Sequence, residues 1–291
     1  MRISPKTQNP ILKRNRRTIK ERLQENTPLI MGVLNITPDS FSDGGEYFNN
    51  ISAAINYAKK MITEGAQIID IGGESTRPYA EAITLEEEKR RVIPVIKALA
   101  QETEALISID TTKAEVALEA LNHGASIVND ISALSFDKDM GKVIAQFKAE
   151  IILMHMQGTP QNMQNNPTYT DTITDIHNYL KERIQFAESL GISADRITID
   201  PGIGFGKTTA DNLKIINYSD SFKSLNKPIL LGLSRKSFIG DTLHLKNPQE
   251  RIFGTAACIA FAVAKKIDIV RVHDIKAMKE VILMTKAILR S

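Results

Sequence analysis

The sequence contains little cysteine and few aromatic residues. Among its 291 residues there is one cysteine, Cys258, no tryptophan, and an aromatic content of 5%. A single thiol excludes a disulfide framework and a metal site built from several thiolates. The most apolar stretch, residues 253–264, is shorter than the about 20 residues that a membrane-spanning helix needs.

The rest of the composition is typical of a globular protein. Hydrophobic residues make up 42% and charged residues 24% of the chain, which argues against disorder. The net charge of +3 is too small to indicate a nucleic-acid partner. We therefore expect a soluble, cytoplasmic protein that binds neither membrane nor nucleic acid.

The basic charge is concentrated at the N-terminus, where Glu21 is the only acid before Leu23. We expect residues 1–27 to be a solvated lead-in, with a mitochondrial presequence as the alternative. The remaining residues, 28–291, contain no linker and are expected to form one domain. The basic side chains of the lead-in are Arg2, Lys6, Lys13, Arg14, Arg16, Arg17, Lys20 and Arg22.

Short apolar runs alternate with helical patterns along the whole domain. The runs are rich in Ile, Val and Leu without polar alternation, as expected of parallel strands buried on both faces. Eight strands, each followed by a helix, predict a single-domain (β/α)₈ TIM barrel of the α/β class, with a doubly wound sheet as the alternative. The predicted strands are 29–34, 67–71, 106–109, 126–128, 151–154, 197–199, 229–231 and 267–270, and the predicted helices are 52–64, 84–99, 112–123, 138–148, 171–189, 209–218, 248–266 and 274–289.

Polar side chains follow the predicted strands, at the end where a barrel carries its catalytic groups. One set is cationic and suits a phosphate ester or pyrophosphate: Arg77, Lys236, Arg271 and His273. A second set, Asp110, Asn129 and Asp200, is rich in acceptors and matches the amidine-like edge of a guanine or a pterin. Together they indicate a flat nitrogen heterocycle with a pyrophosphate tail. Metal ligation by Asp110, Asp200 and His155, or buried structural ion pairs, are the alternatives.

The glycine-rich segment 202–208 fits neither common nucleotide motif. The Walker pattern needs a glycine where the sequence has Pro201, and the dinucleotide fingerprint needs one where it has Lys207. A tight turn or a close backbone approach to a ligand is the better interpretation.

Seven motifs in order resemble the dihydropteroate synthase family. The first is Met31-Gly32-Val33-Leu34-Asn35-Ile36-Thr37-Pro38-Asp39-Ser40-Phe41-Ser42-Asp43-Gly44-Gly45, and the likeness extends from Pro28 to the C-terminus. The other six are Gly73-Glu74-Ser75-Thr76-Arg77-Pro78, Ser108-Ile109-Asp110-Thr111, Val128-Asn129-Asp130, Asp200-Pro201-Gly202-Ile203-Gly204-Phe205, Ser234-Arg235-Lys236-Ser237 and Arg271-Val272-His273-Asp274.

The resemblance implies a transferase of folate synthesis. It would join 6-hydroxymethyl-7,8-dihydropterin pyrophosphate to p-aminobenzoate, release pyrophosphate, use Mg²⁺, form a homodimer and bind sulfonamide inhibitors. The resemblance also assigns a role to each site residue. The pterin is expected to be held by Asp110, Asn129, Asp200 and Lys236, the pyrophosphate by Arg271 and His273, and Mg²⁺ with pyrophosphate by Asn35. The p-aminobenzoate pocket is expected to be formed by Thr76, Arg77, Pro78, Phe205 and Ser237, with Phe41 and Asp43 in a mobile loop. Asp110, Asp200, Lys236, Arg271 and His273 are the expected catalytic residues.

Two other functions are open to a pterin-binding barrel. A methyltetrahydrofolate:corrinoid methyltransferase would share the Asp/Asn edge but would not need Lys236, Ser237, Arg271 or His273 for pyrophosphate. A non-catalytic paralogue would be expected to lose site residues, and this sequence keeps them.

Overall fold

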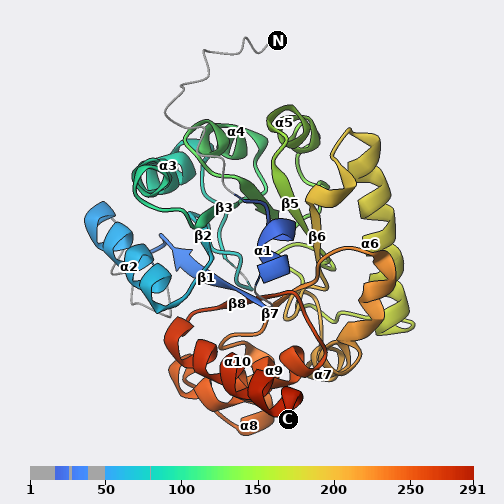
Figure 1. The fold of residues 1–291 in the computed structure, drawn as a ribbon. Coiled ribbons are helices and arrows are strands. Elements are labelled where there is room, and N and C mark those ends of the chain that lie inside the picture. The colour runs from blue at the N-terminus through green and yellow to red at the C-terminus, as the bar shows by residue number, and fades with distance from the viewer. Residues whose placement is uncertain (1–16, 26–27, 39–49, 79) are drawn as a thin grey trace.

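The computed structural model describes residues 17–25, 28–38, 50–78 and 80–291. Its eight parallel strands are hydrogen-bonded in the order β6-β5-β4-β3-β2-β1-β8-β7 (Figure 1). A parallel bridge between Ile199 and Ile229 joins the two outer strands and closes the ring. The predicted barrel is therefore confirmed and the doubly wound sheet is wrong. The strands are β1 (Leu29–Asn35), β2 (Ile68–Gly72), β3 (Leu106–Asp110), β4 (Ile127–Asp130), β5 (Glu150–Met154), β6 (Ile197–Asp200), β7 (Leu230–Gly232) and β8 (Ile269–Val272).

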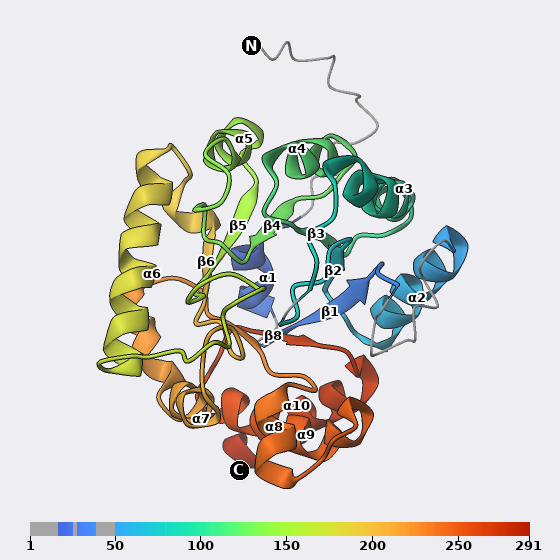
Figure 2. The ribbon, with the colours of Figure 1, turned by 180° about the vertical axis from the view of Figure 1, so that it is seen from behind.

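Helices surround the ring and cover its outer face, as both ribbon views show (Figures 1 and 2). Buried side chains of the helices and of the outward strand positions form one continuous apolar cluster. The predicted helix start at Thr84 is confirmed, because its side chain accepts the Glu87 N–H. The helices are α1 (Ile19–Glu25), α2 (Ile51–Glu64), α3 (Leu85–Glu102), α4 (Ala114–Asn122), α5 (Met140–Phe147), α6 (Thr172–Ser189), α7 (Thr209–Asn217), α8 (Ser237–Leu243), α9 (Ile252–Ala264) and α10 (Ile275–Arg290), with 3₁₀ turns at Ala194–Arg196, Ser219–Leu225 and Pro248–Arg251.

The amino ends of the strands form a second, smaller apolar cluster inside the barrel. It is made largely of the first residues of the strands, such as Leu29, Ile68 and Ile127, and these side chains are almost fully buried. The predicted site residues lie at or beyond the opposite, carboxyl ends. The chemistry is thus confined to one mouth of the barrel.

The end of the basic N-terminal segment differs from the expected solvated lead-in. Helix α1 lies over the amino end of the barrel, where Ile19 is buried in the strand-end cluster and Leu23 packs against it. The Ile19 N–H donates to Glu150 Oε1 at 2.9 Å. The segment is short and rich in charge, so its few apolar residues do not show a helical repeat clear enough to predict this helix. The division of the chain at residue 27 stays a prediction.

Helix α8 was not predicted either, because its seven residues carry little periodicity.

Among the described ranges, no helix is long and apolar enough to cross a membrane.

Candidate active site

Side chains from three strand ends meet around the guanidinium group of Arg271. Its Nε donates to Asp70 Oδ2 at 2.7 Å, and its Nη2 donates to Asp110 Oδ2 at 2.9 Å. Strands β2, β3 and β8 supply these groups, and β1 lies between β2 and β8 in the sheet. The barrel therefore brings residues 70, 110 and 271 together, as the strand-end pattern predicted for Asp110 and Arg271.

Asp70 is a site residue that sequence reasoning missed. It is fully buried, and its Oδ2 also accepts the Asn129 Nδ2 amide at 3.0 Å, so one oxygen holds Arg271 and Asn129 together. Its other oxygen, Oδ1, is buried and has no hydrogen-bond partner among the residues that the structure describes. The signal that could have found it is an acid inside the apolar run 67–71.

Burial makes the two carboxyl groups predicted to bind the pterin weaker acids than ordinary aspartates. Removal from water, and then the neighbouring Asp70, raises the pKa of Asp110 to about 7, although Arg271 counteracts the shift. Burial raises the pKa of Asp200 to about 6, against the Gly202 N–H that donates to its Oδ1 at 2.7 Å. Both groups can therefore exchange a proton near neutral pH.

The cations of the mouth stand close to these acids rather than on a separate rim. The Lys236 ammonium lies 4.5 Å from the centre of the Phe205 ring. Burial and then Arg271 lower the pKa of Lys236 to about 8, while Asp200 and Asp110 oppose the shift. The expected sorting into acidic and cationic sets is thus not kept in space, since Arg271 lies between two carboxylates.

His273 is neutral, and Ser234 holds one of its ring nitrogens. Burial, together with Arg235, Arg271, Lys236 and Arg77, lowers the pKa of His273 to about 3. Its Nδ1 lies 3.0 Å from Ser234 Oγ, which also accepts the His273 backbone N–H at 3.2 Å. With that N–H accepted, the Ser234 hydroxyl is free to donate to Nδ1. This favours the tautomer with its hydrogen on Nε2.

Gly72 leaves an open cradle between Asn35 and Asp110. A Cβ at Gly72 would lie 3.5 Å from Asn35 Oδ1 and 3.8 Å from Asp110 Oδ2, so any side chain there would fill the space between them. Oxygen donors of this kind fit Mg²⁺, which commonly takes one or two protein ligands and completes its shell with substrate phosphates and water. The residues present therefore fit the metal that was predicted.

The glycine-rich segment after β6 packs closely against the loop that follows β5. Gly202 has a φ of +72°, and a Cβ there would meet the His155 carbonyl oxygen at 1.9 Å. The buried Lys207 Nζ lies 2.9 Å from His155 Nδ1 and donates to the Phe205 carbonyl at 2.9 Å. Burial and then Lys207 lower the pKa of His155 to about 2.

The alternative metal site of Asp110, Asp200 and His155 gains no support. The His155 ring nitrogen faces Lys207, and its ring packs edge-on against Tyr179. No group of three or more His, Cys, Asp or Glu side chains that could hold a metal occurs within the described ranges.

Comparison with known proteins gives the family. The pterin binding enzyme family matches residues 31–273. The chain is 49% identical to the dihydropteroate synthase of Synechocystis sp. over 261 residues, 90% of each protein. It is also similar to the crystal structure of a Yersinia pestis dihydropteroate synthase with a sulfonamide drug complex (TM-score 0.87, 41% identity, 91% of this chain and 95% of that one) and to a Xanthomonas albilineans dihydropteroate synthase with 4-aminobenzoic acid (TM-score 0.84, 40%, 91% and 94%).

The chain belongs to the dihydropteroate synthase family. The family, the barrel and the enzyme class predicted from the motifs, a transferase of folate synthesis, are thereby confirmed. The assignments of single residues stay predictions, because the comparisons do not test them.

The remaining predicted residues lie beside the same mouth, after β2 and at the start of α8. Thr76, Arg77 and Pro78 follow β2, and Arg77 is close enough to His273 to affect its pKa. Ser237 is exposed at the start of α8. Phe41 and Asp43 lie outside the described residues.

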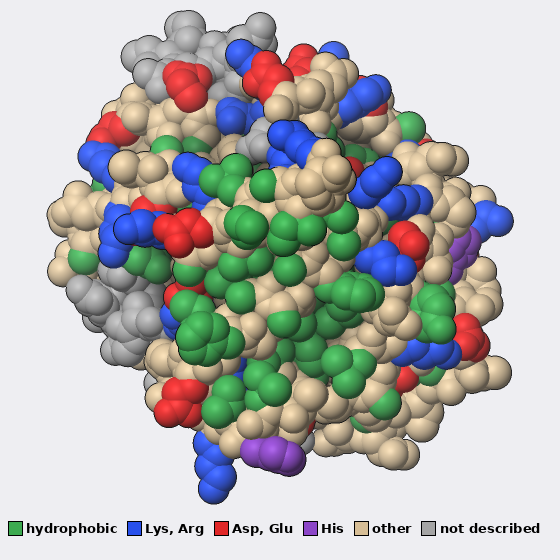
Figure 3. Space-filling view, turned by 60° about the horizontal axis from the view of Figure 1, so that its bottom comes forward, with side chains coloured by type: hydrophobic (Ala, Val, Ile, Leu, Met, Phe, Trp, Pro, Cys, Tyr) green, Lys and Arg blue, Asp and Glu red, His purple; other side chains and the backbone are tan. Residues whose placement is uncertain are grey.

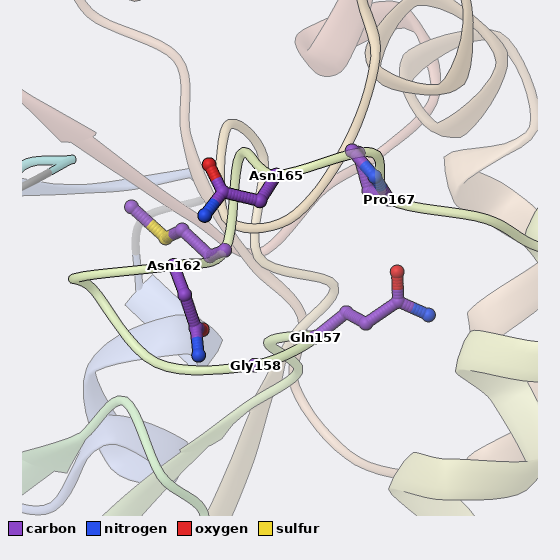
Figure 4. Close-up of a pocket in the computed structure, with 6 residues that line it drawn as sticks. Gln157, Gly158, Asn162, Asn165 and Pro167 are labelled. Carbon is purple, nitrogen blue, oxygen red and sulfur yellow. The ribbon is translucent and has the colours of Figure 1, made fainter.

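A further hollow of about 350 Å³ lies in the loop between β5 and α6 (Figure 4). It is lined by Gln157, Gly158, Asn162, Met163, Asn165 and Pro167, none of which was predicted as a site residue. Gln164 Nε2 donates to the Gly204 carbonyl at 2.9 Å, and Gln161 Nε2 donates to the Ala80 carbonyl at 3.3 Å. The loop thus connects the segments that follow β2 and β6 across the mouth.

Proposed function

We propose that this protein joins 6-hydroxymethyl-7,8-dihydropterin pyrophosphate to p-aminobenzoate in the cytoplasm, giving 7,8-dihydropteroate and pyrophosphate. The observation that carries the proposal is the Arg271 guanidinium held between two buried carboxylates, at 2.7 Å and 2.9 Å, within a mouth that also contains Asp200 and Lys236. The single cysteine is typical of a reducing compartment.

Asp110, Asn129, Asp200 and Lys236 recognise the pterin in this proposal. Carboxylates accept the parallel N–H groups of the pterin edge, and the Asn129 amide can both donate and accept. The buried position of the carboxylates supports the assignment, since a buried acid is stabilised by a ligand that supplies further hydrogen bonds.

Arg271 and His273 take the pyrophosphate. The arylamine of p-aminobenzoate is neutral and nucleophilic at pH 7, so the difficult step is departure of pyrophosphate. Arg271 and Lys236 stabilise the negative charge that grows on pyrophosphate as the C–O bond breaks. The neutral His273 donates a hydrogen bond from Nε2 to the pyrophosphate. The positive charge left on the pterin methylene spreads into the ring, where Asp110 or Asp200 stabilises it, in an SN1-like path.

Thr76, Arg77, Pro78, Phe205 and Ser237 form the p-aminobenzoate pocket in this proposal. Sulfonamides, which mimic p-aminobenzoate, are expected to bind the same pocket. The Phe205 ring, stacked on the Lys236 ammonium, offers an aromatic face beside the pterin residues.

Asn35 would hold Mg²⁺ through Oδ1, beside the cradle at Gly72. When bound together with pyrophosphate, the metal neutralises charge on the leaving group. Asn35 orients its amide oxygen toward that position, and Asp110 borders the same space.

A homodimer is the proposed assembly, and an apolar face over α9 and α10 supports it (Figure 3). Phe253 is 85% exposed there, and apolar faces of this kind on a globular protein mark interaction sites. The large exposed apolar side chains of these two helices are Phe253, Phe261, Leu283, Met284, Ile288 and Leu289.

The test is product formation by the purified protein from the two substrates, with and without Mg²⁺. The proposal predicts dihydropteroate only when both substrates are present, and a loss of product when a chelator removes Mg²⁺. A protein that makes no dihydropteroate with Mg²⁺ present would contradict the reaction, and full activity under chelation would contradict only the metal.

A further inference from the structure

A buried ion-pair cluster lies beside the mouth and outside the residues assigned above. Lys113 Nζ donates to Glu74 Oε2 at 2.9 Å and to Glu88 Oε2 at 2.6 Å. Glu88 on α3 is fully buried, and its carboxylate is held by the Lys113 ammonium and by a second side-chain partner, Thr111. Such a pair is costly to break, because a lone charge would remain in a dry site.

The cluster holds the first residues of the p-aminobenzoate loop. Glu74 directly precedes the segment with Thr76, Arg77 and Pro78, and its Oε1 accepts the Ile83 N–H at 2.8 Å. The Glu74 carboxylate therefore connects the beginning of this loop to Ile83 near its end, and it connects both to Lys113.

The loop is also packed closely against α3 where it begins. The Gly73 carbonyl accepts from Arg91 Nη1 at 2.8 Å, and a Cβ at Gly73 would lie 2.8 Å from Val92 Cγ1 and 3.2 Å from the Glu88 carbonyl oxygen. The loop therefore cannot shift at Gly73 without disturbing the helix turn that carries Glu88.

Lys113 connects this loop to the pterin side of the mouth. It lies three residues beyond Asp110, on the short connection between β3 and α4. Burial alone would lower the pKa of the Lys113 ammonium, but its hydrogen bonds to Glu88 and Glu74 outweigh that effect and raise the pKa. The ammonium is thus charged at neutral pH and bridges three separate elements.

We infer that Lys113, acting through Glu74, is a positioning residue that sets residues 74–78 for p-aminobenzoate relative to the pterin-binding end of β3. The inference rests on the proposed function. It predicts a selective effect, since the hydrogen bonds of Asp110, Asn129 and Asp200 involve no member of this cluster, and Glu88 acts on Asp110 only through its charge, as a minor contribution to the raised pKa.

The test is steady-state kinetics of Lys113→Met, which keeps the length of the side chain but removes the ammonium. We expect the KM for p-aminobenzoate to rise about tenfold, while the KM for dihydropterin pyrophosphate changes less than about twofold, because a small misplacement of one substrate is costly. Lys113→Arg should restore the KM for p-aminobenzoate to within about threefold of the wild-type value.

Lys89→Met is the matched control. Lys89 also links α3 to α4, through Glu115 and Glu119 at 3.4 Å, and its side chain is 24% exposed against 25% for Lys113, but it does not reach the loop. Its KM values should equal those of the wild type.

Glu74→Gln is the second variant, in case Lys113→Met fails to fold. It leaves the Lys113–Glu88 pair in place and should raise the same KM. Wild-type KM values in both Lys113→Met and Glu74→Gln, or equal rises for both substrates, would overturn the inference while wild-type turnover upholds the function. A wild-type protein without turnover would overturn both.

Discussion

At the scale of single residues, the strand-end motifs predict most of the mouth, and the structure adds Asp70. Motifs name residues that follow strands, whereas Asp70 is the middle residue of β2 and lies inside the barrel beside Arg271. Which face of a buried strand a residue takes depends on the closed ring. In a half-exposed strand, alternating polar and apolar residues show which side chains face inward. A strand that is buried on both faces has no such alternation, so its sequence does not show which face Asp70 takes.

Replacing Asp70 by Asn should lower kcat/KM for dihydropterin pyrophosphate about 10- to 100-fold. The neutral amide is a weaker partner for Arg271, and hydrogen bonds to charged groups contribute about 1.5–3 kcal/mol. Steady-state kinetics check the prediction. Asp130→Asn is the control, since Asp130 is equally buried but bonds Ser132 and the Leu134 N–H instead. Equal losses in the two variants would contradict the role given to Asp70.

Binding of 6-hydroxymethylpterin, which carries no pyrophosphate, should strengthen as the pH rises from 5 to 7. A raised pKa keeps a carboxyl group protonated up to a higher pH, so Asp200, with its pKa of about 6, is ionised in about a tenth of the molecules at pH 5 and in about nine tenths at pH 7. Asp200 alone changes Kd about tenfold, and Asp110, with its pKa of about 7, acts in the same direction, so calorimetry should show a change of at least about tenfold. The same Kd at pH 5 and pH 7 would show that an ionised Asp200 is not needed.

At the scale of the elements, the eight strands and the long helices could be predicted, whereas α1 and α8 could not. Residues 29–34 form a strand that extends to Asn35, and residues 171–189 match α6 closely, because strong apolar runs and full helical periods fix such elements locally. The short helices α1 and α8 are stabilised instead by what they cover. Ile19 is buried only because the barrel presents an apolar end to it.

Replacing Ile19 by Ala should lower the free energy of unfolding by about 2–5 kcal/mol, the usual cost of emptying such a site. Turnover should stay unchanged, because α1 lies at the opposite end of the barrel from the mouth. Urea unfolding together with the enzyme assay checks both parts. Ile51→Ala serves as the control. Because Ile51 is 45% exposed, its replacement should change the free energy of unfolding little. A lower kcat in a folded Ile19→Ala protein would contradict the separation of the two ends.

At the scale of the whole molecule, the closed ring explains how motifs far apart in the sequence come together. Residues 70, 110 and 271 meet because β1 pairs with both β2 and β8. The apolar face over α9 and α10 could not be foreseen from the sequence, because α9 is apolar nearly all round and its period does not say which side remains exposed.

Phe253→Asp combined with Met284→Asp should convert the proposed homodimer into monomers. Two charges in an apolar interface are left without partners, whereas they are well solvated in the monomer. Analytical ultracentrifugation measures the change in mass. Phe186→Asp is the control, since Phe186 is also an exposed aromatic residue but lies on α6. A doubly substituted protein with the same mass as the wild type would place the interface elsewhere.

The most direct test of the central claim is turnover by Arg271→Ala, with its fold checked by circular dichroism. If the strand ends form one site in which Arg271 opposes the charge on departing pyrophosphate, kcat should fall at least about 100-fold, the usual cost of losing one such charge-stabilising group. A folded Arg271→Ala protein that makes dihydropteroate at the wild-type rate would contradict the claim.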